Sequence, residues 1–412
     1  MHTKGLAAER ISGLYEGDAL ATALADARAR TLAIYAHLDL PAVRFPCLPI
    51  VNPPLWELAH IAWFQELWCL RSRGSKHELK PPLLRSADEL FNSSTVPHDS
   101  RWHLDYPSAE RLLRYMRDTF DATQEELART PEGRRYFFRL ACFHEDMHAE
   151  ALLMTLQTLA LPAPPIDARD PPPAAANPAN DVFFEGGEFD QGTWQAEFAF
   201  DNEREAHAVR VEPFAMASRP VTQGEFAAFV EDSGATPPAH WRRDGSRWEV
   251  RRFDRWAALD ASAPMLHASL EDALAYCAWA KRRLPTESEW EYAARNGGGM
   301  DRFPWGDEPA SGETLDLRYR GPSLALADPR PSKSGLRQLM GGVWEWTSTA
   351  FAPYPGFHAD PYRDYSQPWF HTHYVLRGGS FATRSRLVHN RFRNFYAAGR
   401  TDPFAGFRTC AV

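Results

Sequence analysis

The sequence lacks the features of membrane-spanning, secreted and nucleic-acid-binding proteins. It contains no apolar run of about 18 residues, so we expect no transmembrane helix. Residues 1–15 lack the basic and apolar regions of a signal peptide. The formal net charge of −8 offers no excess of basic residues that would attract a nucleic acid or an anionic membrane.

Cysteine is scarce, and its distribution excludes a disulfide framework. There are five cysteines, an odd number, and no C-x-x-C pair occurs. They are Cys47, Cys69, Cys142, Cys277 and Cys410. This usage predicts a reduced, cytoplasmic setting.

Size and composition are those of a globular protein with more than one domain. The 412 residues suffice for two or three domains, and 44% hydrophobic and 24% charged residues are ordinary values. The 14 Trp and 25 Phe are unusual. They predict a core in which aromatic rings pack between irregular segments.

The N-terminal part has the pattern of a four-helix bundle. Apolar periodicity, proline at helix starts and capping residues predict helices over about 18–38, 54–71, 108–128 and 131–159. A polar, turn-rich connection, 73–107, separates the second helix from the third. We therefore predict a bundle domain over residues 15–161.

A composition shift separates this bundle from a second domain. Residues 162–180 are rich in proline and alanine and predict a semi-rigid linker. From 181 to 412, short apolar runs alternate with Gly, Pro, Asn and Asp, which predicts an α+β domain with much irregular structure. Short helices are expected after Thr222, after Ser269 and after Thr286 or Ser288.

The chemistry begins with a histidine pair in the fourth predicted helix. His144 and His148 are four residues apart and therefore share one face of that helix. Such a pair can bind one metal ion, although two histidines at this spacing can equally cap or solvate a helix. Glu150 lies about 200° around the helix from His148, so we interpret it as a supporting or structural residue.

A third histidine favours the metal interpretation. His60 lies inside the apolar second helix, where the alternative is a buried, neutral histidine with one hydrogen bond. In helix bundles, metal ligands project inward from facing helices. Three imidazole nitrogens would suit Fe, Zn, Cu or Ni, and the ligand types do not choose among these metals.

Several longer motifs carry a family resemblance. In the C-terminal part they are Arg219-Pro-Val-Thr222-x-x-Glu225-Phe226, Arg283-Leu-Pro-Thr-Glu-Ser-Glu-Trp-Glu-Tyr-Ala-Ala-Arg295, Gly342-Val-Trp-Glu-Trp-Thr347, Leu376-Arg-Gly-Gly-Ser380-Phe381 and Phe404-Ala-Gly-Phe-Arg-Thr409. Together they resemble the formylglycine-generating-enzyme-like domain, a variant of the C-type lectin fold. The N-terminal part resembles the DinB-like four-helix bundle. The tandem, from about residue 20 to 412, resembles the ergothioneine sulfoxide synthase family.

This resemblance implies a reaction and a set of metal ligands. The family binds non-haem Fe(II) with three histidines, here His60, His144 and His148. It uses O2 to join a sulfur donor to imidazole C2 of hercynine, which is N-alpha-trimethylhistidine. Selenoneine synthases are close relatives that use a selenosugar donor.

The resemblance also implies further site residues. Tyr362 matches a tyrosine that supplies a proton or hydrogen atom in the reaction with O2, a role suited to a weakly acidic phenol. Tyr365 would line the hercynine pocket, although both tyrosines could equally be packing residues. Asn394 matches an asparagine that contacts the trimethylammonium group, and Phe395 could add cation–π attraction. The last hundred residues would wall this pocket.

Departures from the family pattern point to the donor. Members that use glutamylcysteine have Trp-Asp after this asparagine, where this chain has Phe395-Tyr396. They also use two arginines before the third helix, whereas Arg101 is the only arginine in the corresponding stretch, 96–106. A dicarboxylate would lose bidentate contacts there, so we favour a selenosugar.

Other donors stay open. Glutamylcysteine or cysteine would give an ergothioneine-type sulfoxide synthase, and Arg71, Arg73 or Arg85 could then bind the donor from another direction. Met147 stands where the family has a glutamine that contacts the imidazole through water, so it would line a drier pocket or simply fill a gap.

Two further hypotheses belong to other functional classes. A DinB-type thiol transferase would use Zn or Ni to activate a thiolate and would consume no O2. A non-catalytic ligand-binding protein would need no metal. Formylglycine-generating activity is not expected, because Cys277 and Cys410 lack the signature of the cysteine pair that such enzymes use.

Overall fold

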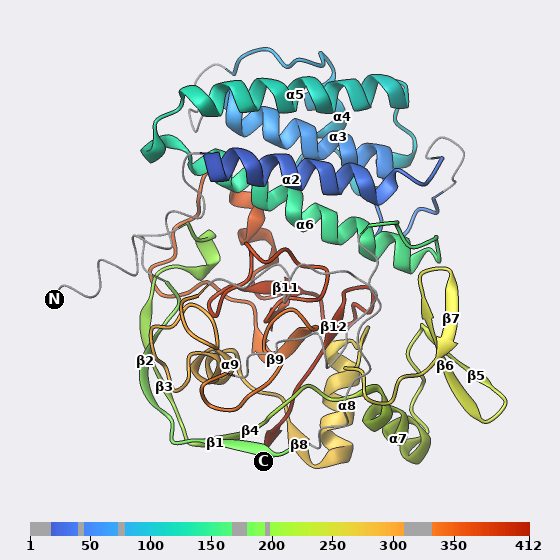
Figure 1. The fold of residues 1–412 in the computed structure, drawn as a ribbon, viewed down its shortest axis with the longest axis vertical. Coiled ribbons are helices and arrows are strands. Elements are labelled where there is room, and N and C mark those ends of the chain that lie inside the picture. Colours follow the sequence, from blue (N-terminus) through green and yellow to red (C-terminus); the bar gives the residue numbers. More distant parts are fainter. Residues whose placement is uncertain (1–17, 40–44, 73–78, 167–178, 194–197, 309–331) are drawn as a thin grey trace. The chain divides into compact units, whose positions relative to one another are not determined.

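The computed structural model describes residues 18–39, 45–72, 79–166, 179–193, 198–308 and 332–412. They form two units (Figure 1). The N-terminal unit is Met1–Leu159 with Ala163–Ile166 and Ala196–Phe198, and the C-terminal unit is Ala160–Pro162, Asp167–Gln195 and Ala199–Val412. Most of the predicted linker, residues 167–178, lies outside the described residues. No helix in the described ranges is long and apolar enough to cross a membrane.

The described part of the N-terminal unit is built on four long helices that lie side by side (Figure 1). They are α2 (Asp18–Tyr35), α3 (Pro54–Gln65), α5 (Ala109–Arg129) and α6 (Tyr136–Thr158). Helix α3 packs against both α5 and α6, and α2 packs against α6. This arrangement confirms the predicted helical bundle.

Local sequence explains most of these helices. The predicted inner face of α2, from Leu20 to Tyr35, is buried. Proline occupies the start of α3, and the Ser108 hydroxyl accepts a hydrogen bond from the Arg111 amide at the start of α5. One feature was not predicted: after Gln65 the second helix continues as a π-helix, η2 (Glu66–Ser72).

The connection between α3 and α5 has structure of its own. It contains the short helix α4 (Ala87–Phe91) and the 3-10 helix η3 (His98–Trp102). A further 3-10 turn, η4 (Glu132–Arg134), precedes α6.

The C-terminal unit contains small sheets joined by long loops. One has the order β1-β4-β13-β8 and another the order β11-β10-β9-β12. Their strands are β1 (Asp181–Phe184), β4 (Phe214–Ala217), β13 (Cys410–Ala411), β8 (Arg282–Arg283), β11 (Asn394–Tyr396), β10 (Tyr374–Arg377), β9 (Trp344–Ala350) and β12 (Ala405–Gly406). Two smaller antiparallel sheets are also present. One pairs β2 (Gly187–Gln191) with β3 (His207–Val211), and the other consists of β5 (Trp241–Asp244), β6 (Arg247–Arg252) and β7 (Arg255–Ala258).

Capping boxes begin the helices of this unit. They are α7 (Gln223–Ser233), α8 (Leu270–Ala280) and α9 (Glu287–Ala294). At α9 the cap is Thr286, whose hydroxyl accepts from the Glu289 amide while the Glu289 carboxylate accepts from the Thr286 amide. The open choice between Thr286 and Ser288 is thereby decided for Thr286.

Buried ion pairs connect the irregular segments of this unit. The Arg377 guanidinium lies 3.0 Å from the Glu287 carboxylate and 2.7 Å from the Glu291 carboxylate, and all three side chains are buried. Arg393 also binds Glu287, at 2.7 Å. The network joins β10, α9 and the segment before β11.

Removal of Arg377 should destabilise the protein strongly. In an Arg377→Met variant, two buried carboxylates lose a partner, which typically costs about 3–5 kcal/mol. Arg210→Met is the matched control, because Arg210 and Glu212 form an exposed pair worth at most about 1 kcal/mol. Denaturant unfolding of both variants measures the loss in free energy of unfolding. Equal losses would contradict a stabilising role for the buried network.

Candidate metal centre

His60 is held on the buried face of α3 with one ring nitrogen already engaged. Its Nδ1 lies 2.8 Å from the Phe91 carbonyl oxygen, which can only accept, so Nδ1 carries the proton and donates. Nε2 therefore presents its lone pair. The Trp56 ring stacks on the imidazole, with ring centroids 5.0 Å apart and planes 5° apart. Burial, followed by the charge of His148, lowers the pKa of His60 to about 3, so the ring is neutral.

His144 and His148 approach His60 from α6. The centroids of these two rings lie 4.4 Å apart, and the centroid of the His60 ring lies 5.2 Å and 5.0 Å from them. The Phe64 ring stacks on His144 at 3.5 Å. Burial holds the pKa of His144 well below its ordinary value, and the charges of His148 and His60 lower it further.

A carboxylate orients the third ring. The Nδ1 atom of His148 donates to Oε1 of Glu57 across 2.8 Å, and Glu57 is buried in α3, one turn before His60. Metal-bound histidines characteristically donate their second ring nitrogen to a carboxylate or carbonyl oxygen, which fixes the tautomer and strengthens the ligand. Phe91 does this for His60, and Glu57 does it for His148.

The donor set fits a bound metal ion. One nitrogen from each of the three histidines lies within 4.8 Å of the others; His60 and His144 are buried and His148 is half-buried. The helical spacing and the facing-helix argument predicted this convergence, and the three nitrogens could hold one metal ion. A second group among the described residues, Cys47, His98 and Asp99, meets the same distance criterion.

Glu57 is the participant that sequence reasoning missed. A signal was present, because Glu57 is a lone carboxylate within the apolar run from Leu55 to Phe64. A buried charge requires a partner, and His60, one turn away on the same helix, hinted at one. Its actual partner, His148, lies 91 positions further along the chain and could not be identified from spacing.

Two predicted substrate residues also belong to the N-terminal unit. Met147 is half-buried and directly precedes His148 on α6. Arg101, in η3, is buried beside the centre: its guanidinium lies over the Trp56 ring at 3.9 Å, and Trp56 stacks on His60. Its terminal nitrogens donate to Asn52 Oδ1 at 2.8 Å and to the Val96 carbonyl at 3.1 Å.

The other predicted substrate residues lie in the C-terminal unit. The rings of Tyr362 and Tyr365 are 6.2 Å apart, and Tyr365 makes an edge contact with Phe395 at 5.9 Å. Burial is the main cause that raises the pKa of both phenols, so both are protonated at neutral pH. Asn394 and Tyr396 are half-buried in the same strand as Phe395, β11. These five residues thus form one neighbourhood of the C-terminal unit.

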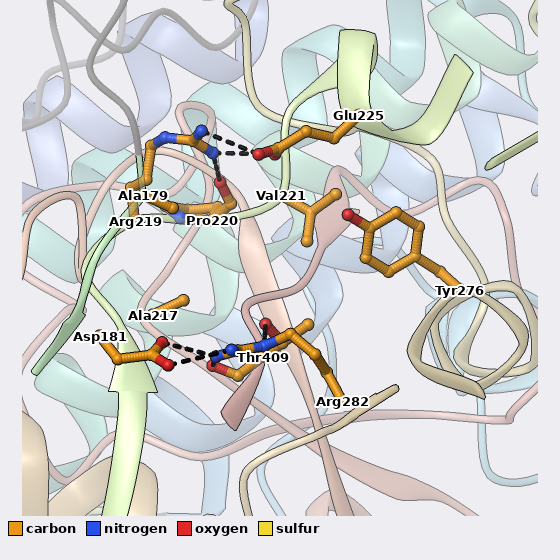
Figure 2. A pocket seen from close by; sticks show the side chains of 10 residues that line it. All are labelled: Ala179, Asp181, Ala217, Arg219, Pro220, Val221, Glu225, Tyr276, Arg282 and Thr409. Carbon is orange, nitrogen blue, oxygen red and sulfur yellow. Dashed lines mark hydrogen bonds and ion pairs between the residues drawn. The ribbon is translucent and has the colours of Figure 1, made fainter. Parts of the chain in front are cut away.

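A pocket elsewhere in the C-terminal unit contains none of the predicted residues (Figure 2). Its volume is about 180 Å³. Arg219 is paired with Glu225, and Arg282 with Asp181, each through two hydrogen bonds. The four charges therefore cancel in pairs, and we assign this pocket no role in the chemistry.

Comparison with known proteins identifies both units. Residues 23–157 match the DinB superfamily, and residues 167–411 match the sulfatase-modifying factor enzyme 1-like domain. The hercynine oxygenase of Mycolicibacterium thermoresistibile is 34% identical over 425 residues, which cover 94% of each protein. The chain belongs to the ergothioneine sulfoxide synthase family.

Further relatives agree with this assignment. The hercynine oxygenase of Mycobacterium tuberculosis is 34% identical over 94% of this chain and 97% of its own length. Ergothioneine biosynthesis protein 1 of Schizosaccharomyces pombe is 25% identical over 88% of this chain and 52% of that larger protein. The family resemblance noted in the sequence is thereby confirmed.

Replacement of Glu57 should weaken metal binding without removing a ligand. In Glu57→Gln the shape is kept, but His148 loses its charged acceptor, and such changes typically cost about 10–100-fold in metal affinity. Glu66→Gln is the matched control, because Glu66 is also buried but accepts from Tyr115 and from the Leu83 amide. Titration of the metal-free proteins with Fe(II) measures the affinities. Equal affinity in Glu57→Gln and wild type would mean that Glu57 does not support the centre.

Proposed function

We propose that this protein is a non-haem Fe(II)- and O2-dependent enzyme that forms a carbon–selenium bond at imidazole C2 of hercynine, with a selenosugar as donor. The observation that carries the proposal is the cluster of three converging histidines, two of them oriented by a hydrogen-bond acceptor. It occurs in a chain that matches hercynine oxygenases over nearly its whole length.

The names of the relatives support hercynine as the substrate and an oxidative reaction. Two of them are called hercynine oxygenase, and each aligns over 94% of this chain. Coupling breaks the imidazole C2–H bond and the chalcogen–hydrogen bond and forms the carbon–chalcogen bond. It releases two electrons and two protons, which O2 accepts. If the product also keeps one oxygen atom on the chalcogen, the other oxygen atom leaves as water.

His60, His144 and His148 would hold the iron. Iron would supply the ability to activate O2 and would keep coordination positions for substrates, because three protein ligands converge among the described residues. Neutral ligands leave the full positive charge of the ion available to a donor anion. The residues themselves contribute fixed geometry: Phe91 and Glu57 hold two rings in the tautomer that presents a lone pair inward.

Residues of the C-terminal unit would bind hercynine and deliver a proton. We assign Tyr362 the role of proton or hydrogen donor, because burial keeps its phenol protonated. Tyr365 and Phe395 offer ring surfaces suited to a trimethylammonium group, and Asn394 offers an amide oxygen. In the structure that oxygen accepts from the Phe395 amide at 2.8 Å, which fixes the side chain.

Two features support a neutral donor over a dicarboxylate. Tyr396 replaces the aspartate that would pair with a donor amine. Arg101, the only arginine of residues 96–106, is buried and donates to Asn52 and Val96, so little of its guanidinium remains for a donor carboxylate. Trp102, His103 and Tyr396 provide aromatic and mixed polar groups suited to a sugar. Ergothioneine-type sulfoxide formation with glutamylcysteine or cysteine is the alternative, supported by the names of the relatives.

A competition assay tests the donor. Purified protein with Fe(II), O2 and hercynine is offered a selenosugar, glutamylcysteine and cysteine together, and the products are read by mass spectrometry. We expect a selenium-containing hercynine adduct as the main product. His60→Ala should give no adduct from any donor.

Each other outcome of this assay has a distinct meaning. A sulfur adduct as main product would replace the selenosugar by a thiol donor and leave the rest of the proposal intact. Thiol transfer without O2 consumption would instead indicate a DinB-type transferase and overturn it. A fully active His60→Ala variant would contradict the hypothesis of a three-histidine metal centre.

Substitution of Tyr362 tests its assigned role. Tyr362→Phe keeps the ring but removes the phenol proton, so we expect slower adduct formation by about 10²–10⁴-fold, or diversion to oxidation of the donor alone. Tyr276→Phe, a tyrosine of α8 in the same unit that packs on Phe226 and Phe407, is the control. Single-turnover rates and the product ratio are measured. An unchanged rate and ratio in Tyr362→Phe would make this residue a packing residue.

A further inference from the structure

A second cluster of ligand-type side chains lies apart from the three histidines, in the segments that flank them. It comprises Cys47, in the stretch that leads into α3, and His98 and Asp99, in η3. One donor atom from each lies within 4.8 Å of the others. The His98 Nδ1 atom is 2.8 Å from Asp99 Oδ1, and the Cys47 sulfur is 3.8 Å from the same oxygen.

The hydrogen bonds of His98 show which of its nitrogens faces this cluster. Nε2 lies 2.8 Å from the Val51 carbonyl oxygen, which accepts only, so Nε2 carries a proton. In the neutral ring, Nδ1 then presents its lone pair toward a carboxylate oxygen 2.8 Å away. Two electron pairs do not face one another at that distance, so a proton or a metal ion lies between the two atoms.

The remaining features favour a metal ion of the zinc class. Donation of the second ring nitrogen to a backbone carbonyl is the usual support for a metal-bound histidine, and the same arrangement occurs at His60. A thiolate, an imidazole and a carboxylate are typical Zn²⁺ ligands, and three protein ligands leave one tetrahedral position for water. The thiolate and the carboxylate also neutralise a divalent ion.

A nucleophilic role for Cys47 fits less well. In a cysteine–histidine pair a ring nitrogen acts as the base for the thiol, but both nitrogens of His98 face oxygen atoms. The sulfur hydrogen-bonds to the Asp99 carboxylate, 3.8 Å away. The arrangement therefore suits coordination better than proton transfer from the thiol to His98.

We propose that Cys47, His98 and Asp99 form a second divalent-metal site of the zinc class, distinct from the three-histidine centre. When the ion binds, the thiol of Cys47 loses its proton to solvent and a sulfur–metal bond forms. This inference is independent of the proposed function, because it rests on other residues and on a ligand other than iron.

The site would cross-link two segments that contact His60 through Arg101 and Trp56. The stretch that carries Cys47 is already joined to η3, since Trp102 Nε1 donates to the Phe45 carbonyl and Arg101 donates to Asn52. Arg101 stacks on Trp56, and Trp56 stacks on His60. An ion at Cys47 would add a cross-link to this connection and hold the start of α3 in place.

Cobalt substitution tests the site, because the three-histidine centre contains no sulfur. Co²⁺ added to the metal-free full-length protein should give a sulfur-to-cobalt charge-transfer absorption in the near ultraviolet. The band should persist in His60→Ala and vanish in Cys47→Ser. Absence of the band in wild type, or its survival in Cys47→Ser, would overturn the proposal.

Thiol protection gives a second measurement that does not depend on activity. Cys47 is exposed and the other four cysteines are buried, so a disulfide reagent such as dithionitrobenzoate modifies Cys47 first. One equivalent of Zn²⁺, but not of Mg²⁺, should slow this modification. In His98→Ala the apparent Zn²⁺ affinity should fall by at least about tenfold, as expected for a lost ligand.

His103→Ala is the matched control, because His103 follows η3 directly and is not part of the cluster. It should keep full protection by Zn²⁺. Equal protection in wild type and His98→Ala would show that the thiolate binds zinc alone, and no protection in wild type would show that no site exists. Both results contradict the three-ligand site.

Discussion

Three imidazoles can share one ion only if each is neutral and aims a lone pair at the same point, and this constraint determines much of the N-terminal unit. Burial removes the charge from His60 and His144, while acceptors outside the ring hold His60 and His148 in the required tautomer. Helix α3 contributes both His60 and the carboxylate that orients His148 on α6. The bond between Glu57 and His148 therefore both joins α3 to α6 and sets the geometry of the cluster.

In the C-terminal unit, buried groups are likewise matched with partners, here arginines with carboxylates. Its loops are long, and buried arginines bind carboxylates and carbonyl oxygens across them, as Arg377 does with Glu287, Glu291 and the Asn390 carbonyl. Aromatic rings fill the space between these pairs, including Trp290 and Trp344, which are almost completely buried. The unusual number of aromatic residues in the sequence is thus explained by a core that few regular strands support.

Local sequence signals predicted those features of the structure that depend on residues close together in the chain. The spacing of His144 and His148, the cap at Ser108 and the cap at Thr222 are properties of single helices, and the structure agrees with them. What the sequence could not provide are pairings between distant segments. The Glu57–His148 bond, the Cys47–His98–Asp99 cluster and the contacts of Arg101 each need the positions of the segment before α3 and of η3. The motifs of the C-terminal part identified its fold through family resemblance, because its short strands carry weak periodic signals.

The π-helix after α3 has a consequence for the contacts that this helix makes. Each α-helical residue rotates the chain by about 100°, and a π-turn accommodates an extra residue in one turn. Residues 66–72 thus change the phase of the chain relative to the turns that carry His60, and Arg71, within the π-helical turns, binds Asp88. The turns that carry His60 and the turns that carry Arg71 can consequently satisfy different partners within one continuous helix.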